Sequence, residues 1–253
     1  MNETYLKRIW LEEESAAHMT GWDFSHIAGR WEEDERLPWD YRRIVLDALS
    51  PDQRLLDMGT GGGEFLLTLG HPPALTTVTE AYPPNVLLCR EKLEPLGISV
   101  AAVTHDSALP LPDEAFDLVI NRHESYDPAE VRRILKPGGL FITQQVGQFN
   151  DREFAELLLP GLPLPFPGHG AEEQAERFRR AGFSILRTDE AFRPIRFLDV
   201  GALVWFARIC EWEFEGFSVA KCFPRLMEAQ RLLERHGSLE GSSHRFLIVA
   251  RKD

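Results

Sequence analysis

The hydrophobic and polar positions between Gln53 and Val146 alternate between two periodicities. Short apolar runs of strand length recur there, at residues 54–58, 74–80, 98–106, 115–122 and 140–147. Segments with helical spacing lie between several of them, at residues 63–70, 83–97 and 127–139. Because strands and helices alternate, and the strand runs are apolar on both faces, the pattern predicts a parallel, doubly wound α/β sheet.

Polar residues stand where the predicted strands end. They are Asp57 before a glycine-rich turn, Glu80, Asp106 and the run from Asn121 to Glu124. In a doubly wound sheet the ligand binds beyond the carboxyl ends of the strands, near the point where the strand order reverses. We therefore expect these polar side chains to surround a ligand at one edge of the sheet.

The turn DMGTGGG places Gly59, Gly61 and Gly63 between a strand and a helix, where glycine permits a positive φ and a close approach to the main chain. It is not a dinucleotide fingerprint, because Glu64 stands at the third glycine position and a carboxylate there disfavours pyrophosphate. A phosphate-binding loop would need Gly-Lys-Ser/Thr, which is absent. Glu80 is placed like an acid that binds ribose hydroxyls, and the alternative is a solvated loop carboxylate.

Four segments in register resemble the successive motifs of class I S-adenosylmethionine-dependent methyltransferases. They are LLDMGTGGG, VTEAYPPNV, THDSALPLPDEAFDLVINRHE and ILKPGGLFITQQVG. The resemblance is strong over residues 53–146, extends more weakly to the end of the chain, and is closest to the bacterial small-molecule type 11 group. It implies a Rossmann-like, seven-stranded, mostly parallel sheet whose last strand is antiparallel, and S-adenosyl-L-methionine as the cofactor.

The resemblance also implies roles for residues of the first two motifs. Asp57 and the main chain of Gly59, Thr60 and Gly61 would face the ammonium and carboxylate of the methionine part. Glu80, followed by Ala81, would bind the ribose diol. An anionic pocket suits this ligand, because its sulfonium and ammonium groups are cationic.

The remaining cofactor contacts fall on later motifs. Tyr82 would cover one face of the adenine, and Asp106 with Ser107 beside it would accept a hydrogen bond from the adenine amino group. Asn121 and Arg122 would lie next to the sulfonium and the incoming nucleophile. Because the methyl donor is already activated, in-line placement of the nucleophile supplies much of the rate.

A general base is a separate question. His123 is the best placed candidate, because imidazole titrates near neutrality and could take a proton from an oxygen or nitrogen nucleophile. The alternative is a histidine bonded locally to orient the loop. Glu124 could orient His123 or act as the base itself. We expect no metal site, because no partner ligand stands at metal-binding spacing.

The flanking segments are expected to determine the acceptor. Four of the six tryptophans, Trp10, Trp22, Trp31 and Trp39, lie in the first 41 residues, which predicts a helical lid over residues 1–50 on a methyltransferase domain spanning 51–253. The alternative is that these rings only fasten a helix to the sheet. Residues 192–243 form a second, helical insertion, in which DVGALVWFARICEW is apolar almost all round, as in a buried helix or an apolar binding surface. Residues 159–170 are rich in proline, and either wall the acceptor site with His169 at the tip or form a rigid linker.

Composition narrows the partners. The net charge of −12 disfavours a nucleic-acid partner. The fourth strand is also not followed by Asn/Asp-Pro-Pro-Tyr/Phe, the motif with which nucleic-acid methyltransferases of this superfamily bind an exocyclic amine. Cys89, Cys210 and Cys222 have no zinc or redox spacing and are expected to be reduced. We find no signal-peptide pattern or membrane-spanning run, and therefore expect a cytoplasmic protein.

Together these features predict a methyltransferase (EC 2.1.1.-) that transfers a methyl group by in-line displacement to a small molecule. An RNA or protein methyltransferase and a non-catalytic S-adenosylmethionine-binding protein remain as alternatives. A dehydrogenase is a weaker interpretation, because Glu64 and the Lys136 to Gly139 turn argue against it. The acceptor atom, the pathway and the oligomeric state are left open.

Overall fold

The computed structural model describes residues 2–18 and 23–253, so the predicted contribution of Trp22 lies outside the described residues. The α-helices in this part of the chain are α1 Glu3–Ala16, α2 Tyr41–Ala48, α3 Glu64–Leu67, α4 Pro83–Leu93, α5 Pro128–Ile134, α6 Arg152–Leu158, α7 Ala171–Arg180, α8 Val200–Ile209 and α9 Val219–His236. The strands are β1 Trp31–Glu33, β2 Leu55–Met58, β3 Thr76–Glu80, β4 Ser99–Ala102, β5 Phe116–Arg122, β6 Leu135–Val146, β7 Phe183–Phe197 and β8 Leu239–Lys252. None of these helices is long and apolar enough to cross a membrane.

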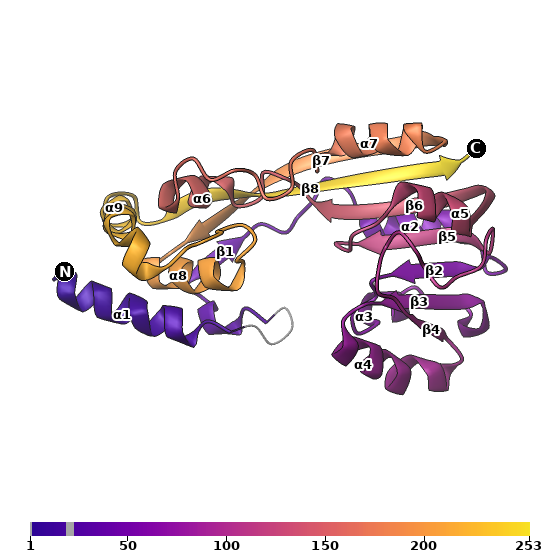
Figure 1. The fold of residues 1–253 in the computed structure, drawn as a ribbon, viewed down its shortest axis with the longest axis horizontal. Coiled ribbons are helices and arrows are strands. Elements are labelled where there is room, and N and C mark those ends of the chain that lie inside the picture. Colours follow the sequence, from indigo (N-terminus) through magenta and orange to yellow (C-terminus); the bar gives the residue numbers. More distant parts are fainter. Residues whose placement is uncertain (1, 19–22) are drawn as a thin grey trace. The chain divides into compact units, whose positions relative to one another are not determined.

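The sheet confirms the predicted fold class. Its strand order is β1-β7-β8-β6-β5-β2-β3-β4, with parallel pairs from β6 to β4 and an antiparallel last strand β8 beside β6 (Figure 1). The predicted count of seven strands is wrong for the described residues, which form eight. The additional strand is β1, which pairs antiparallel with the far end of β7. Three residues with mixed polarity gave no strand signal of their own.

Strand β6 begins five residues earlier than the predicted run at 140–147. The register between β5 and β6 shifts between Phe116 and Leu118. Residues 136–139, which include Pro-Gly-Gly, form an irregularity within β6 and not a turn before it. Gly139 is required there, because a Cβ atom would lie 2.9 Å from the Lys136 carbonyl oxygen and 3.1 Å from that of Asp117. A Pro-Gly-Gly run thus belongs to a strand that the sequence pattern alone began too late.

The chain divides into two compact units. The first unit comprises residues 1–37, 148–167 and 191–244, and the second comprises residues 38–147, 168–190 and 245–253. Residues 38–50 of the predicted lid belong to the second unit by their contacts. Strands β7 and β8 contribute residues to both units, and β7 continues to Phe197, so the helical part of the insertion begins at α8.

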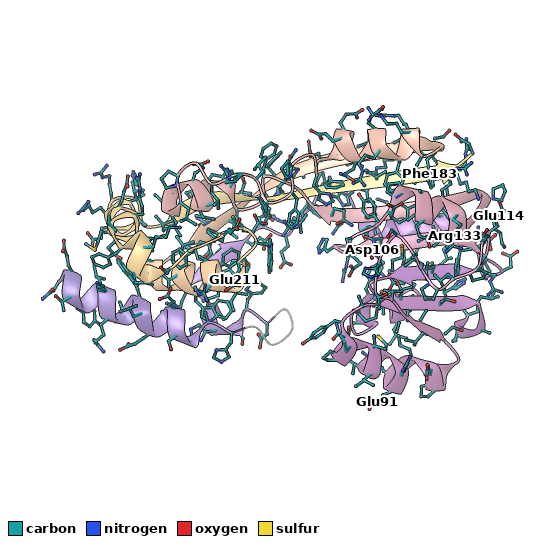
Figure 2. The ribbon with its side chains drawn as sticks, in the orientation of Figure 1. Glu91, Asp106, Glu114, Arg133, Phe183 and Glu211 are labelled. Atoms are coloured by element: carbon teal, nitrogen blue, oxygen red, sulfur yellow. The ribbon has the colours of Figure 1, made fainter. Side chains whose placement is uncertain are left out.

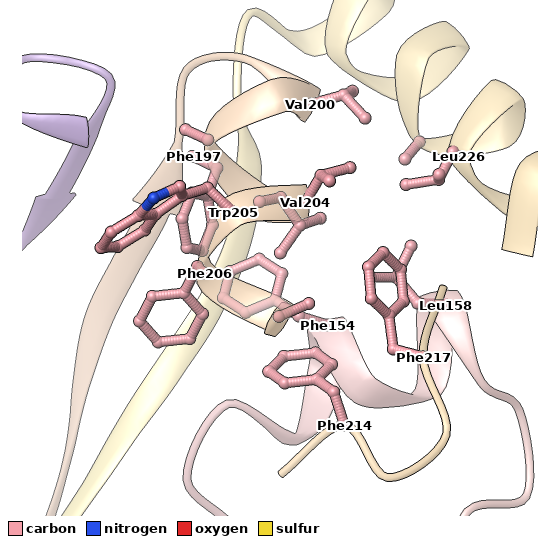
Figure 3. Close-up of a cluster of buried hydrophobic side chains, with 14 of the residues drawn as sticks. Phe154, Leu158, Phe197, Val200, Val204, Trp205, Phe206, Phe214, Phe217 and Leu226 are labelled. Atoms are coloured by element: carbon pink, nitrogen blue, oxygen red, sulfur yellow. The ribbon is translucent and has the colours of Figure 1, made fainter. Parts of the chain in front are cut away.

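Helix α8 is the centre of the first unit. Every residue from Val200 to Ile209 except Arg208 is buried, so the predicted all-round apolar helix is a core element and not an exposed binding surface. Around it Phe206 packs edge to face on Phe197, at 5.2 Å between ring centroids, and Phe197 packs in the same way on Phe154 at 5.0 Å (Figure 3). Trp10 is also buried in this cluster.

The second unit is built on the parallel strands, whose register aligns their carboxyl ends. Met58 of β2 pairs with Asn121 of β5, Arg122 pairs with Gln144 of β6, and Glu80 of β3 pairs with Ala102 of β4. Because parallel strands run in one direction, the polar residues that follow or end them are brought to one edge. This alignment positions the candidate site.

Candidate functional site

The glycine turn after β2 has the predicted backbone. Gly59, Gly61 and Gly63 have φ values of +65°, +61° and +77°, a region that favours glycine, and Gly63 is the residue before helix α3. The Thr60 amide donates to the Thr79 carbonyl at 3.1 Å, which ties the turn to β3. A Cβ atom at Gly61 would have no heavy atom within 4 Å, so this residue presents an open face.

Gly59 is different, because a Cβ atom there would lie 2.4 Å from Cγ of Glu124. The absent side chain of Gly59 therefore makes room for the side chain of Glu124. Of the two predicted ligand-facing glycines, only Gly61 leaves its Cβ direction open.

Two side chains of helix α4 donate hydrogen bonds to the glycine turn. The Cys89 thiol donates to the Gly61 carbonyl at 2.9 Å, and Lys92 Nζ donates to the Gly62 carbonyl at 2.9 Å. Burial raises the pKa of Cys89 to about 11, so the thiol keeps the proton that it donates. Lys92 also pairs with Glu64 at 2.6 Å, which lowers the pKa of that carboxyl group. Spacing within α4 gave no signal for these two contacts, because they depend on where the helix packs.

Glu80 is the organising carboxylate of this edge. It is buried at 5% exposure, and its Oε2 accepts a hydrogen bond from the Gly61 amide at 2.9 Å. Its Oε1 accepts from the amides of Ala81 and Tyr82, each at 2.9 Å. These bonds fix the carboxylate between the glycine turn and the start of α4 and leave further acceptor capacity on Oε2.

Asp57 is a buried acid, and within the described residues its hydrogen-bond partner is the Thr60 hydroxyl at 2.7 Å. Burial raises its pKa to about 7, the nearby negative charge of Glu80 adds to the rise, and Thr60 and the positive charge of Arg122 oppose it. When desolvation raises the pKa of a buried carboxyl group to about neutral pH, a nearby cation stabilises its ionised form. The chemistry of the site therefore suits a cationic ligand.

The residues assigned to the adenine lie on two segments of the second unit. Tyr82 precedes α4 and is 61% exposed, and Ser107 is exposed. Asp106 accepts a short hydrogen bond from the Ser125 hydroxyl. Figure 2 marks Asp106 and also Arg133, whose guanidinium anchors the same loop by donating to the carbonyl oxygen of Leu111 at 2.8 Å.

Asn121, the second-last residue of β5, lies in a buried network of side-chain amides and a hydroxyl. Its Oδ1 accepts from the Gln145 amide at 2.6 Å and from the Thr143 hydroxyl at 3.1 Å. Its Nδ2 has no hydrogen-bond partner among the described residues. An orphaned buried donor is costly, so this nitrogen suits a hydrogen bond to a ligand or to ordered water.

Arg122 lies above an aromatic pair. Its guanidinium carbon is 4.7 Å from the centre of the Phe65 ring, and Phe65 is 5.3 Å from the ring of Tyr41. The Tyr41 hydroxyl donates to the carbonyl oxygens of Asn121 at 3.0 Å and Ile142 at 3.3 Å. Sequence reasoning had no signal for Phe65, which belongs to the short helix α3.

His123 follows Arg122 with a φ of +64°, an uncommon value for a residue with a side chain. Its ring is exposed in part, yet the surrounding protein atoms, followed by the positive charges of Arg245 and Arg122, lower its pKa to about 3. Burial and the charge of Asp106 raise the pKa of the neighbouring Glu124. His123 is therefore a neutral imidazole at neutral pH.

Several other expectations can be placed in the structure. His169 packs on Phe246 at 5.2 Å between ring centroids and near Tyr126 at 6.5 Å, within the second unit. The three cysteines are free and buried, as expected. The described residues contain no cluster of three or more side chains suited to a metal ion.

Comparison with known proteins adds a family to this geometry. Residues 56–143 match the family described as "Methyltransferase domain". The chain is 33% identical over 136 residues to a demethylmenaquinone methyltransferase of Thermus thermophilus, covering 47% of this chain and 62% of that protein. It is 27% identical over 140 residues to a ribosomal RNA small subunit methyltransferase G of Chlorobium limicola, covering 53% and 61%. The chain thus spans less than two thirds of the length of these curated relatives.

Among solved structures, a functionally unknown protein from Deinococcus radiodurans superposes with a TM-score of 0.56 at 16% identity, covering 91% of this chain and 97% of that one. At this identity the similarity speaks for the fold alone. It extends the agreement beyond the matched domain to most of the chain.

Proposed function

We propose that this chain, whose residues 56–143 match the methyltransferase domain family, is a class I S-adenosylmethionine-dependent methyltransferase that transfers a methyl group from this cofactor to a small-molecule acceptor. The observation that carries the proposal is the open face of Gly61 beside two buried carboxyl groups, Asp57 and Glu80. The glycine lets a ligand reach the main chain, and the acids suit a ligand with positive charge.

The proposed cofactor contacts follow from these residues. Asp57 would bind the ammonium group, with the main chain of Gly59 to Gly61 beside the methionine carboxylate. Glu80 would accept hydrogen bonds from the ribose hydroxyls through the acceptor capacity that its three amide bonds leave. When bound, the cofactor supplies an activated methyl group on a cationic sulfur.

The other proposed contacts lie after β3, after β4 and at the end of β5. Asp106, with Ser107, would accept from the adenine amino group, and the exposed Tyr82 ring would cover the adenine. Asn121 offers its Nδ2, which has no partner in the described part of the chain, and Arg122 would extend this edge toward the acceptor. Positioning of the acceptor, more than covalent help from the protein, would accelerate the transfer.

A ribosomal RNA acceptor is the second candidate, because one relative carries that name at 27% identity. The net charge of −12 argues against it, because an RNA backbone is attracted by clustered basic residues. The demethylmenaquinone methyltransferase, at 33% identity, favours a small molecule. A cytoplasmic location stays a prediction. A protein that binds S-adenosylmethionine without catalytic activity stays an alternative.

Calorimetric titration with S-adenosylmethionine tests the cofactor site. The wild-type protein should bind, and Gly61→Val should lose at least about 100-fold in affinity, because the side chain would enter the open face at a positive φ. Gly70→Val is the matched control, because Gly70 has a φ of +64° and equally open surroundings but lies outside the site. Equal affinities for the two variants, or no binding to the wild type at millimolar cofactor, would reject the proposed site.

Methyl transfer tests the acceptor class. Labelled S-adenosylmethionine is incubated with the protein and a cell extract that has been separated into small-molecule, RNA and protein fractions. Label in the small-molecule fraction that disappears with Gly61→Val supports the proposal. Label confined to RNA would favour the second candidate, and tight cofactor binding without label in any fraction would favour a non-catalytic binding protein.

A further inference from the structure

Three side chains of the second unit form a continuous chain at the ends of β5 and β6. Trp39 Nε1 donates to Oε1 of Gln144 at 2.8 Å, and this bond is buried. Nε2 of Gln144 lies 3.4 Å from Nε2 of His123, a long contact for a hydrogen bond. The His123 backbone amide also donates to the Gln144 carbonyl at 2.9 Å, so the two residues are held together by main chain and side chain.

The chain of donors assigns the proton on His123. An indole N–H can only donate, so the atom of Gln144 that faces Trp39 is its carbonyl oxygen and the atom that faces His123 is its amino group. An amino group also only donates, so Nε2 of His123 must present its lone pair. In the neutral ring the proton is then on Nδ1, an assignment that rests on the hydrogen-bond network.

Two positive charges surround the same ring. Arg122 precedes it and makes no ion pair with a carboxylate in the described part of the chain, while its guanidinium stacks on Phe65. Arg245 lies on β8 opposite Val146, two residues beyond Gln144 on the neighbouring strand. Desolvation is the main cause that lowers the pKa of His123, and both guanidinium groups add to it.

We propose that His123 donates a hydrogen bond through Nδ1–H to an anionic oxygen of the methyl acceptor, with Arg122 binding the same oxygen, and that Gln144 and Trp39 are positioning residues. The acceptor class is a small molecule that carries a carboxylate or phenolate oxygen. This inference rests on the proposed methyltransferase function and replaces a base with a donor at His123. The carboxylates around Asp57 serve a cationic cofactor, and the cations around His123 serve an anionic acceptor.

Long-range proton–nitrogen NMR spectra of the nitrogen-15-labelled protein read the tautomer directly. The signals of His123 are assigned by their loss in His123→Gln. We expect the neutral Nδ1–H form between pH 5 and about 8, because the pKa is lowered to about 3. An Nε2–H tautomer, or a ring that titrates near its ordinary pKa of about 6.5, would overturn the proposal.

Gln144→Glu provides a test that a purely structural role would not satisfy. A carboxylate accepts hydrogen bonds, so the His123 proton should move to Nε2 and its pKa should rise. Gln53→Glu is the matched control, because Gln53 accepts a bond from the Ser50 amide at 2.8 Å, which a carboxylate can also accept. An unchanged tautomer in Gln144→Glu would overturn the role of Gln144.

Benzoate and benzyl alcohol test the acceptor class in the presence of S-adenosylhomocysteine. Benzoate should shift the Nδ1–H resonance of His123 to lower field, and benzyl alcohol, which has the same ring without the charge, should not. Arg122→Gln should weaken the benzoate effect at least about tenfold. No shift at millimolar benzoate, or equal shifts with both probes, would overturn the anionic acceptor. Calorimetry with S-adenosylhomocysteine on the same samples shows separately whether the cofactor site itself has failed.

Discussion

The two units differ in how the chain builds them. The central part of the second unit is one continuous segment, residues 38–147, whereas the first unit is assembled from residues 1–37, 148–167 and 191–244. In the continuous segment each polar residue lies within a strand, at its end or a few residues beyond it, so position along the chain reports the site. In the first unit the contacts join segments far apart in sequence, such as Arg30 and Asp199, so spacing reports little.

Asp57 in the second unit and Asp199 in the first differ in how their carboxyl groups are used. In the second unit Asp57 is buried without an ion-pair partner in the described residues, and the Asn121 Nδ2 atom has no hydrogen-bond partner there. In the first unit Asp199 makes two 2.7 Å bonds with Arg30 and caps helix α8 through the Ala202 amide at 2.8 Å. Polar groups left with unused bonding capacity are costly to the fold, and proteins retain such costs chiefly at functional sites.

The largest expected effect is on the packing of the first unit. Phe206→Ala should lower the free energy of unfolding by about 3–5 kcal/mol, because Phe206 is 5% exposed and packs on Phe197 and Phe214. Phe166→Ala, at a ring that is 53% exposed, should cost less than about 1 kcal/mol. Urea unfolding measures both. At temperatures where Phe206→Ala stays folded we expect unchanged affinity for S-adenosylmethionine, and a large loss would break the division between a packing unit and a binding unit.

Loss of the Asp199 side chain in the first unit should have the next largest effect. Asp199→Ala removes both the bidentate pair with Arg30 and the cap of α8, and should cost about 2 kcal/mol in urea unfolding. The control is Glu12→Ala, which removes an exposed pair with Arg8 and should change stability by no more than about 0.5 kcal/mol. Equal losses would mean that partner number and geometry do not distinguish the two pairs.

The buried acid of the second unit predicts a pH dependence. The ionised form of Asp57 would bind the cationic cofactor, so affinity should fall below the pKa of about 7, by up to about tenfold per pH unit, and level off above it. Asp57→Asn should bind more weakly and without most of this dependence. Calorimetry between pH 5.5 and 8.5 measures it, and equal wild-type affinity at both ends would contradict the role of Asp57.

The same raised pKa has the opposite effect on the protein without cofactor. Because folding raises the pKa of Asp57, the free energy of unfolding falls as the pH rises from the ordinary pKa of an aspartate toward the raised pKa. Asp57→Asn should therefore unfold at a higher urea concentration than the wild type at pH 8, by on the order of 1 kcal/mol. A variant that gains stability while losing the cofactor would sharpen the distinction between groups that stabilise the fold and groups held ready for a ligand.

The smallest expected effect concerns the support of the glycine turn by α4. Lys92→Met removes the bond to the Gly62 carbonyl and the pair with Glu64, and should weaken cofactor binding roughly three- to tenfold, as one lost hydrogen bond would. Arg90→Met is the control on the same helix, because Arg90 contacts Glu94 at 4.0 Å on an exposed face. Indistinguishable affinities would show that the turn holds its shape without α4.

Sequence reasoning was most successful where a local rule applies. The strand before Asp57, the positive φ values at Gly59, Gly61 and Gly63, and the alignment of strand ends were all predicted from residue type and spacing. It began β6 too late, because Pro-Gly-Gly ordinarily marks a turn. It also missed β1, whose pairing with β7 joins residues more than 160 apart. The residue roles at the site stay predictions that the experiments above address.

The sequence by itself determined the order of elements, the glycine turn and the acids at the strand ends, because these follow from periodicity and from the backbone freedom of glycine. Tertiary structure alone decided which groups meet. It placed Glu124 in the space beside Gly59, set Cys89 and Lys92 on the glycine carbonyls, and connected Trp39 through Gln144 to His123. The physical reason is that proton positions and pKa values depend on burial and on neighbours from distant parts of the chain, which no local pattern encodes.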